Sequence, residues 1–143
     1  MPKVSVLVPV YNVERYIGRC ARSIFRQTFQ DWEAIFVDDA SPDASMQELE
    51  RAIGEFPALH GKVKTIQHEK NRGSAAARAT ALKEATGEYV LFVDSDDFIT
   101  TDMLAKMVTA ARKEQADLTV CNYVEQTAAG ERVVDVKITP PKC

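Results

Sequence analysis

The chain has 143 residues and a formal net charge of -3; 45% of its residues are hydrophobic and 27% are charged. These values are ordinary for one globular domain, and the lack of a basic run excludes nucleic acid as a main partner. No apolar stretch approaches the roughly 20 residues that span a bilayer, and the N-terminus carries no signal peptide. We therefore expect no membrane span and a cytoplasmic location, which includes the inner face of the membrane.

The cysteines and histidines predict no reactive centre. Cys20, Cys121 and Cys143 are widely spaced and odd in number, which argues against a disulfide framework or a zinc site. Cys20 and Cys121 fall within predicted elements and are expected to be small core residues. His60 and His68 are far apart in sequence and have no partner that indicates nucleophilic catalysis, so we expect structural or surface roles for both.

Strand and helix patterns alternate along the chain. In chain order we predict a strand at 4–10, a helix beginning near Glu14, a strand at 32–37, a helix at 45–56, a strand at 63–67, a helix at 73–85, a strand at 89–93, a helix at 101–115 and a strand at 118–124. Residues 133–138 are a candidate sixth strand after a turn at Ala129-Gly130, and Asn12 is the expected cap of the first helix. This alternation predicts an α/β fold, a three-layer sandwich in which helices cover a mainly parallel sheet.

The most informative segment is residues 89–97. A short apolar run there ends in Asp94, Asp96 and Asp97, at the carboxyl end of a predicted strand, where ligands bind in open α/β sheets. Side chains alternate along extended backbone, so Asp94 and Asp96 would point the same way. Two such oxygen ligands suit Mg²⁺ or Mn²⁺, especially when substrate phosphates complete the coordination. An acidic helix cap is the alternative, but clustered acids repel one another unless a cation is present.

Three other loop regions should meet at the same edge of the sheet. Tyr11 follows the first strand and offers a face on which a nucleobase could stack, and Asp39 follows the second and could accept a base N–H. Residues 71–73 precede a helix and offer backbone N–H groups and a cation for phosphate, with Arg78 further along that helix. Each has a plainer alternative: packing on the sheet edge for Tyr11, backbone hydrogen bonding for Asp39 and an ordinary turn for residues 71–73.

Together these motifs resemble the family 2 glycosyltransferases. The motifs that carry the resemblance are residues 4–12, 36–41, 71–73 with Ala77-Arg78, and 87–97. The resemblance extends from Lys3 to about Tyr123. It implies a GT-A fold, a nucleotide-sugar donor, a divalent metal ion and inversion of configuration at the anomeric carbon of the sugar.

Carried over residue by residue, the resemblance implies a donor site. Asp39 would pair with the base, commonly uracil. Asp96 would be the direct metal ligand, with Asp94 near the ribose or the water shell of the metal. The implied nucleotide-binding residues are Pro9, Tyr11 and Asn12 in the nucleoside pocket, with Asp39, Asn71, Gly73, Arg78, Asp94 and Ser95. The implied cofactor is Mn²⁺ or Mg²⁺, held by Asp96 and Asp94.

The sequence departs from the family pattern at two places. Ala40 stands where the family more often has Gly, and Ala79-Thr80 follows Arg78 where Asn-Ala is more usual. Either departure could alter the pocket. Neither removes a charged group that the chemistry needs.

The family places its catalytic base and its acceptor-binding region well beyond position 143, so no catalytic residue is assigned to this chain. We expect residues 1–143 to be a single donor-binding domain, truncated at its C-terminus and inactive alone. The expected partners are a nucleotide-diphosphate sugar, with a UDP-sugar favoured, and an acceptor glycan or lipid-linked sugar of cell-envelope polysaccharide synthesis. The main alternative is a non-catalytic nucleotide-sugar-binding module. A phosphoacceptor receiver or a nucleotidyltransferase fits less well, because neither an acidic pair nor a glycine-rich loop follows the first strand.

Overall fold

A computed structural model describes residues 2–134 of the chain, which divides into two compact units, Met1–Leu104 and Ala105–Cys143. The elements of the first unit are β1 (Val4–Val10), α1 (Ile17–Phe25), β2 (Trp32–Asp38), α2 (Ser45–Gly54), the 3-10 helix η1 (Pro57–Lys62), β3 (Val63–Gln67), α3 (Ser74–Glu84) and β4 (Tyr89–Phe92). The helix α4 (Met103–Glu114) begins at the end of this unit. None of the helices in the described part of the chain combines the length and the apolar character that a membrane span requires.

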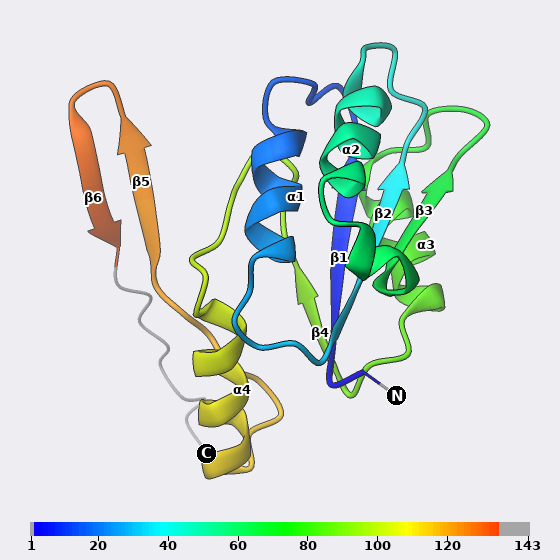
Figure 1. The fold of residues 1–143 in the computed structure, drawn as a ribbon. Helices are drawn as coiled ribbons and strands as arrows, with labels where there is room; N and C mark the ends of the chain where they lie inside the picture. Colours follow the sequence, from blue (N-terminus) through cyan, green and yellow to red (C-terminus); the bar gives the residue numbers. More distant parts are fainter. Residues whose placement is uncertain (1, 135–143) are drawn as a thin grey trace. The chain divides into compact units, whose positions relative to one another are not determined.

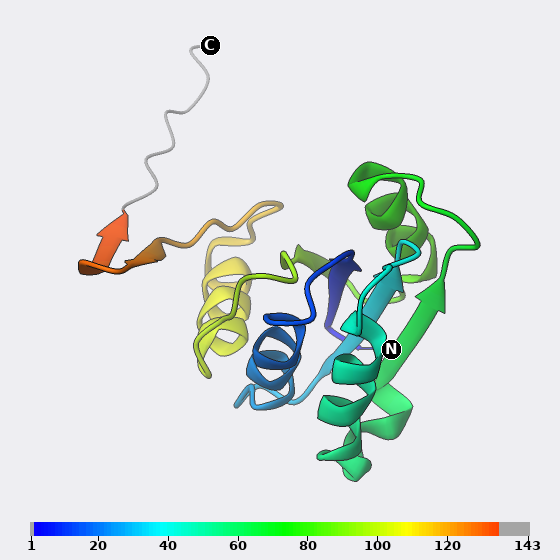
Figure 2. The same cartoon turned by 90° about the horizontal axis from the view of Figure 1, so that it is seen from above.

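The first unit is built on a four-stranded parallel sheet. The strand order is β3-β2-β1-β4, with Val4 of β1 opposite Trp32 of β2 and Tyr89 of β4. Helices α1 and α2 lie on one face of this sheet and α3 lies on the other (Figures 1 and 2). The prediction of an α/β fold with helices on both sides of a parallel sheet is therefore confirmed.

Small side chains let α3 approach the sheet. Ala77 and Ala81 are buried against Leu7, Ile35 and Val37 of the two central strands. Because these strands are covered on both faces, their residues form near-continuous apolar runs instead of an alternating pattern. The strand ends are thereby held at a fixed position relative to the N-terminus of α3.

Aromatic side chains fill the opposite face. The Phe25 ring of α1 stacks on Trp32 with 6.2 Å between ring centroids, and its edge contacts Phe36 and Phe56 at 6.1 Å and 5.4 Å. Offset and edge-to-face contacts of this kind stabilise a core beyond the burial of apolar area alone. They fix α1 against β2 and the end of α2.

A buried glutamine anchors the segment that follows β4. The side-chain amide of Gln27 donates to the Thr100 carbonyl at 2.6 Å and accepts from the Leu104 backbone N–H at 3.0 Å. Thr28 N–H also donates to the Thr101 carbonyl at 2.9 Å. Since Gln27 is 1% exposed, these bonds satisfy polar groups that would otherwise be costly to bury.

Several predicted boundaries are wrong. Helix α1 begins at Ile17 and not near Glu14, and Asn12 does not cap it. The reason is that backbone N–H groups of residues 12–14 are bound by side chains of the segment before α2 and of its first residue, Ser45. Strand β4 ends at Phe92, one residue before the predicted end.

The second unit contains a hairpin where one strand was predicted at 118–124. Strands β5 (Tyr123–Thr127) and β6 (Gly130–Val134) form a separate antiparallel pair, and Leu118 is 77% exposed. The predicted turn at Ala129-Gly130 lies at the connection of this hairpin, and residues 135–138 of the candidate sixth strand fall outside the described residues. Cys121 is exposed, so its prediction as a core residue is wrong, whereas Cys20 is buried as expected.

We expect Gly87→Ala to destabilise the first unit. A Cβ at position 87 would lie 2.6 Å from Ser5 Oγ and 2.7 Å from the Ser5 backbone nitrogen, in the central strand, which cannot move aside. The expected loss is roughly 1–3 kcal/mol in the free energy of unfolding, measured by urea denaturation. Gly61→Ala is the matched control, because its Cβ would meet nothing within 4 Å. Equal stability of the two variants would contradict the expectation.

Candidate functional site

A cleft of about 510 Å³ opens at the carboxyl ends of β1, β2 and β4. The residues that line it are Pro9, Val10, Tyr11, Val13, Asp39, Asn71, Gly73, Ser74, Ala77, Arg78, Asp94, Ser95 and Asp96. The structure thus brings together every predicted binding residue except Asn12, which is not among the lining residues. This is the edge at which a parallel α/β sheet binds ligands.

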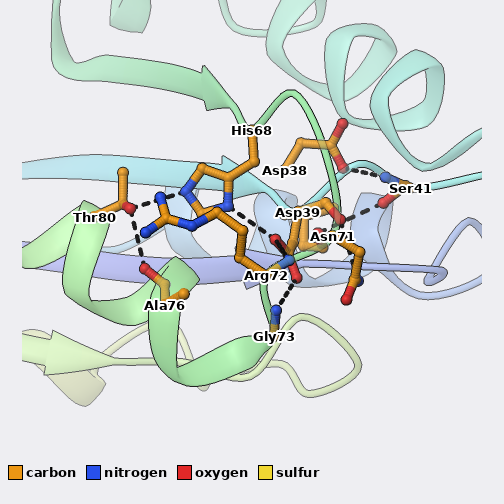
Figure 3. Close-up of polar contacts among 10 residues, drawn as sticks. Asp38, Asp39, Ser41, His68, Asn71, Arg72, Gly73, Ala76 and Thr80 are labelled. Carbon is orange, nitrogen blue, oxygen red and sulfur yellow. Dashed lines mark hydrogen bonds and ion pairs between the residues drawn. The ribbon is translucent and has the colours of Figure 1, made fainter.

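Asp39 is the most heavily hydrogen-bonded side chain of the cleft. Its Oδ1 accepts the Arg72 backbone N–H at 2.8 Å and lies 2.8 Å from His68 Nδ1, while Oδ2 accepts the Gly73 backbone N–H at 2.8 Å (Figure 3). The Asn71 side-chain amide donates to the Asp39 carbonyl at 3.3 Å. One carboxylate therefore orders the whole connection between β3 and α3.

The charge of Asp39 is maintained although the side chain is 2% exposed. Burial acts to raise the pKa of Asp39, but the hydrogen bond from His68 and those from the Arg72 and Gly73 backbone outweigh it, so the pKa is lowered. The carboxylate is consequently an acceptor only. The His68 side chain is buried beside Asp39, and His60 is exposed.

The loop that carries Tyr11 is tied to the N-terminus of α2. Val13 N–H donates to Ser45 Oγ at 2.8 Å, and that hydroxyl donates to Asp43 Oδ1 at 2.5 Å. Asp43 Oδ2 accepts the Glu14 backbone N–H at 3.1 Å. Burial opposes the charge of Asp43, yet the Ser45 hydroxyl and the backbone N–H groups lower its pKa. Tyr11 itself is 48% exposed at the cleft.

Two loop residues adopt the left-handed conformation. Asn12 has φ 55° and Ala40 has φ 60°. Asparagine tolerates this region, whereas alanine adopts it at a cost of roughly 1–2 kcal/mol that glycine avoids. This conformation accounts for the glycine that the family more often has at position 40.

Asp94, Asp96 and Asp97 bring one carboxylate oxygen each to within 4.8 Å of one another, and all three side chains are exposed. The predicted extended backbone is wrong: Asp97 N–H donates to the Asp94 carbonyl at 3.0 Å and closes a turn. The turn adds Asp97 to the two predicted metal ligands. Hard oxygen ligands in such a group suit a divalent cation.

The surroundings of Asp97 disfavour its charged form. Burial and the neighbouring charges of Asp96 and Asp94 raise its pKa. Burial, followed by the charges of Asp97, Asp96 and Asp94, raises the pKa of the Cys20 thiol to about 12. Cys20 is therefore a neutral core residue and no nucleophile.

Arg78 links α3 to the acidic group. Its guanidinium lies 2.8 Å from Asp94 Oδ1 and donates to Ser74 Oγ at 3.0 Å. Both partners of the ion pair are partly exposed, with 38% and 55% of their side chains accessible. The ion pair thus holds the positive charge of Arg78 between the N-terminus of α3 and the acidic side chains.

Sequence reasoning missed four residues that hold the site: Ser41, Asp43, Ser45 and Thr80. Ser41 N–H donates to Asp38 Oδ1 at 3.0 Å, and Thr80 Oγ1 lies 2.8 Å from His68 Nε2. The run of small polar residues at 41–45 is a signal for turn and cap hydrogen bonds. No local signal could have paired His68 with Thr80 or Asp39.

The chain belongs to the glycosyl transferase family 2, whose sequence model matches residues 5–136. The uncharacterized glycosyltransferase EpsJ of Bacillus subtilis is 36% identical over 128 residues, which cover 90% of this chain and 36% of EpsJ. Residues 1–349 of TarS of S. aureus, solved in complex with UDP, superpose with a TM-score of 0.72 at 37% identity, covering 80% of this chain and 33% of that chain. The mannosyltransferase PcManGT from Pyrobaculum calidifontis, solved with GDP-Man and Mn²⁺, gives 0.71 at 33% identity, covering 77% and 32%.

The likeness to these structures confirms the predicted fold of the GT-A type. The chain spans about a third of the length of EpsJ and of the two solved chains named above.

We expect Asp39→Asn to cost roughly 2 kcal/mol in the free energy of unfolding at neutral pH, because one amide N–H would face a buried donor. Asp38→Asn is the matched control: Asp38 accepts the Ser41 N–H through one oxygen, which the amide retains. Urea denaturation of both variants measures the difference. Equal losses would contradict the expectation that the hydrogen bonds of Asp39 contribute more to the free energy of unfolding than that of Asp38.

A comparison of the wild type with Asp39→Asn also gives a pH test. The folded-state pKa of Asp39 is lowered, so its charge stabilises the fold above the unfolded pKa of about 3.9. This contribution is lost as the pH falls through the folded-state pKa. We expect the stability difference between wild type and Asp39→Asn to stay constant down to about pH 5 and to shrink below about pH 4. A difference that grew on acidification would contradict the assignment.

Proposed function

We propose that this chain forms the donor site of a glycosyltransferase. The whole protein would transfer a sugar from a nucleotide-diphosphate sugar to an acceptor hydroxyl, with inversion and with assistance from Mn²⁺ or Mg²⁺. The observation that supports this proposal is the meeting of four groups in one cleft. An exposed aromatic ring, a buried acceptor carboxylate, an arginine and an acidic triad all lie at its walls or rim.

The nucleoside end of the donor would lie at Tyr11 and Asp39. Tyr11 offers a ring face to the base, since nearly half of its surface is accessible. Asp39 would accept a ring N–H of the base, a group that both uracil and guanine possess. TarS was solved with UDP and PcManGT with GDP-Man, which is consistent with a base of either kind.

The diphosphate end would lie between the N-terminus of α3 and the acidic triad. Gly73 and Ser74 are at the start of α3, where the helix dipole favours an anion, and Arg78 adds a positive charge. The triad fits a divalent ion, because it offers oxygen ligands whose mutual repulsion a cation relieves. A bound ion would supply charge neutralisation for the departing nucleotide. Asp96 would be its main ligand, because Arg78 already engages Asp94.

The acceptor side of the reaction needs a general base. The described carboxylates that line the cleft are Asp39, Asp94 and Asp96. In this proposal all three serve the nucleotide and the cation, and the base comes from beyond residue 143. The 143-residue chain alone would then bind donor and transfer little sugar. If the chain belongs to an enzyme, the acceptor would be a glycan or a lipid-linked sugar. The same assignment of residues also fits a non-catalytic module that binds a nucleotide-sugar.

We expect UDP to bind the chain more tightly in the presence of Mn²⁺, by about tenfold, which corresponds to ~1.4 kcal/mol. Asp96→Ala should remove this metal-dependent gain and leave the weaker metal-free binding in place. Asp31→Ala is the control, because Asp31 is exposed just before β2, at the opposite end of the strands. Calorimetric titration with UDP, GDP and dTDP, with and without Mn²⁺, measures each value. If none of the three nucleotides bound, the proposed function would be wrong.

Two exposed tyrosines provide a second test. Tyr11→Ala should weaken UDP binding by about tenfold, because stacking of a base on an aromatic ring contributes roughly 1–3 kcal/mol. Tyr16→Ala is the matched control: Tyr16 is 44% exposed, against 48% for Tyr11, but does not line the cleft. Fluorescence or calorimetric titration with UDP measures the affinity of each variant. An equal effect of both substitutions would exclude stacking on Tyr11.

A further inference from the structure

A histidine and a threonine stand behind Asp39, outside the cleft lining. His68 Nδ1 lies 2.8 Å from Asp39 Oδ1, and His68 Nε2 lies 2.8 Å from Thr80 Oγ1 (Figure 3). The His68 side chain is 6% exposed and that of Asp39 is 2% exposed. The three residues come from the ends of β3 and β2 and from α3, so the contact joins three separate elements.

The direction of these hydrogen bonds follows from the chemistry of the partners. The Asp39 carboxylate can only accept, so Nδ1 of His68 carries the proton of their bond. Thr80 Oγ1 also lies 3.0 Å from the Ala76 carbonyl, to which it donates. While it makes this bond, the hydroxyl can only accept from Nε2–H; it donates to a bare Nε2 instead when its one proton turns away from Ala76, so Thr80 can bond Nε2 in either protonation state.

The same bonds leave Asp39 with one free acceptor position. Each carboxylate oxygen can accept about two hydrogen bonds. Oδ1 already accepts from His68 and Arg72, whereas Oδ2 accepts only from Gly73 among the described residues. The remaining position on Oδ2 matches one donor, such as the single ring N–H of a base. His68 thereby determines which oxygen of Asp39 is available and in which plane it lies.

We propose that His68, held by Thr80, is a positioning residue for base recognition: it fixes Asp39 so that Oδ2 accepts the ring N–H of the donor nucleotide. This inference rests on the proposed function of the cleft. It also gives a role to one of the two sequence departures from the family, because Thr80 supplies the hydroxyl that orients the histidine ring.

The test compares UDP with N3-methyl-UDP, which lacks the ring N–H. Calorimetry should show UDP binding to the wild-type chain about tenfold more tightly, the effect of one hydrogen bond to a charged group. His68→Phe keeps a ring and removes both donors, so it should abolish most of this preference while leaving the affinity for N3-methyl-UDP within about twofold. GDP and N1-methyl-GDP replace this pair if the wild-type chain prefers guanine.

Conservative variants separate positioning from folding. His68→Asn retains a donor near the Nδ1 position and should keep the preference for UDP, as should Thr80→Ser, which retains the hydroxyl. Thr80→Val should lower the preference by about threefold, because the ring loses its anchor. His60→Phe, at an exposed histidine of η1, should match the wild type. Should His68→Phe fail to fold, Thr80→Val against Thr80→Ser gives the same comparison.

Two results would overturn the inference while the proposed function stands. One is a wild-type chain that binds UDP and N3-methyl-UDP equally well. The other is a His68→Phe or Thr80→Val chain that loses affinity for both nucleotides by the same factor, the pattern of a purely structural role. Failure of the wild-type chain to bind any nucleoside diphosphate would instead contradict the proposed function.

Discussion

The site depends on one buried carboxylate. Asp39 collects donors from His68, Arg72 and Gly73, three positions far from it in sequence, and its own charge is maintained by them. A buried charge without such partners would be very costly. The ends of β2 and β3 and the start of α3 are thus held at a common point, which fixes the position of the N-terminus of α3 at the cleft. In the proposed function, stability and ligand recognition would use the same side chain, which lines the cleft while being almost inaccessible.

The opposite wall of the cleft follows another principle. Asp94, Asp96 and Asp97 are exposed and repel one another, and the guanidinium of Arg78 offsets part of that repulsion. Such an arrangement favours a cation beside the carboxylates, because a cation offsets their repulsion, and an anionic phosphate on the side of Arg78. In the proposed function, the hydrogen-bonded wall at Asp39 and the acidic wall near Arg78 would give the cleft a base end and a phosphate end. This polarity matches the order of groups in a nucleotide-diphosphate sugar.

Much of the fold could be predicted from the sequence, because apolar runs such as residues 4–10 and 32–37 have one stable place, inside a parallel sheet covered by helices. Convergence of the loops followed from the same rule, since parallel strands present their carboxyl ends at one edge. The start of α1 could not be predicted, because side chains at 41–45 bind its preceding loop. The turn that brings Asp97 to the other two acids could not be predicted either. The same is true of the hairpin of β5 and β6, because its short strands carry no signal for which strand each one pairs with. The contact of His68 with Asp39 spans 29 positions and exists only in the folded chain.

The most direct measurement is a crystal structure of the chain grown with UDP and Mn²⁺. The account predicts an anomalous manganese peak beside the carboxylate of Asp96, the uracil ring against the face of Tyr11, and the ring N–H within hydrogen-bonding distance of Asp39 Oδ2. A nucleotide bound outside this cleft, or a base turned away from both Tyr11 and Asp39, would contradict the claim that these loops hold a single nucleotide.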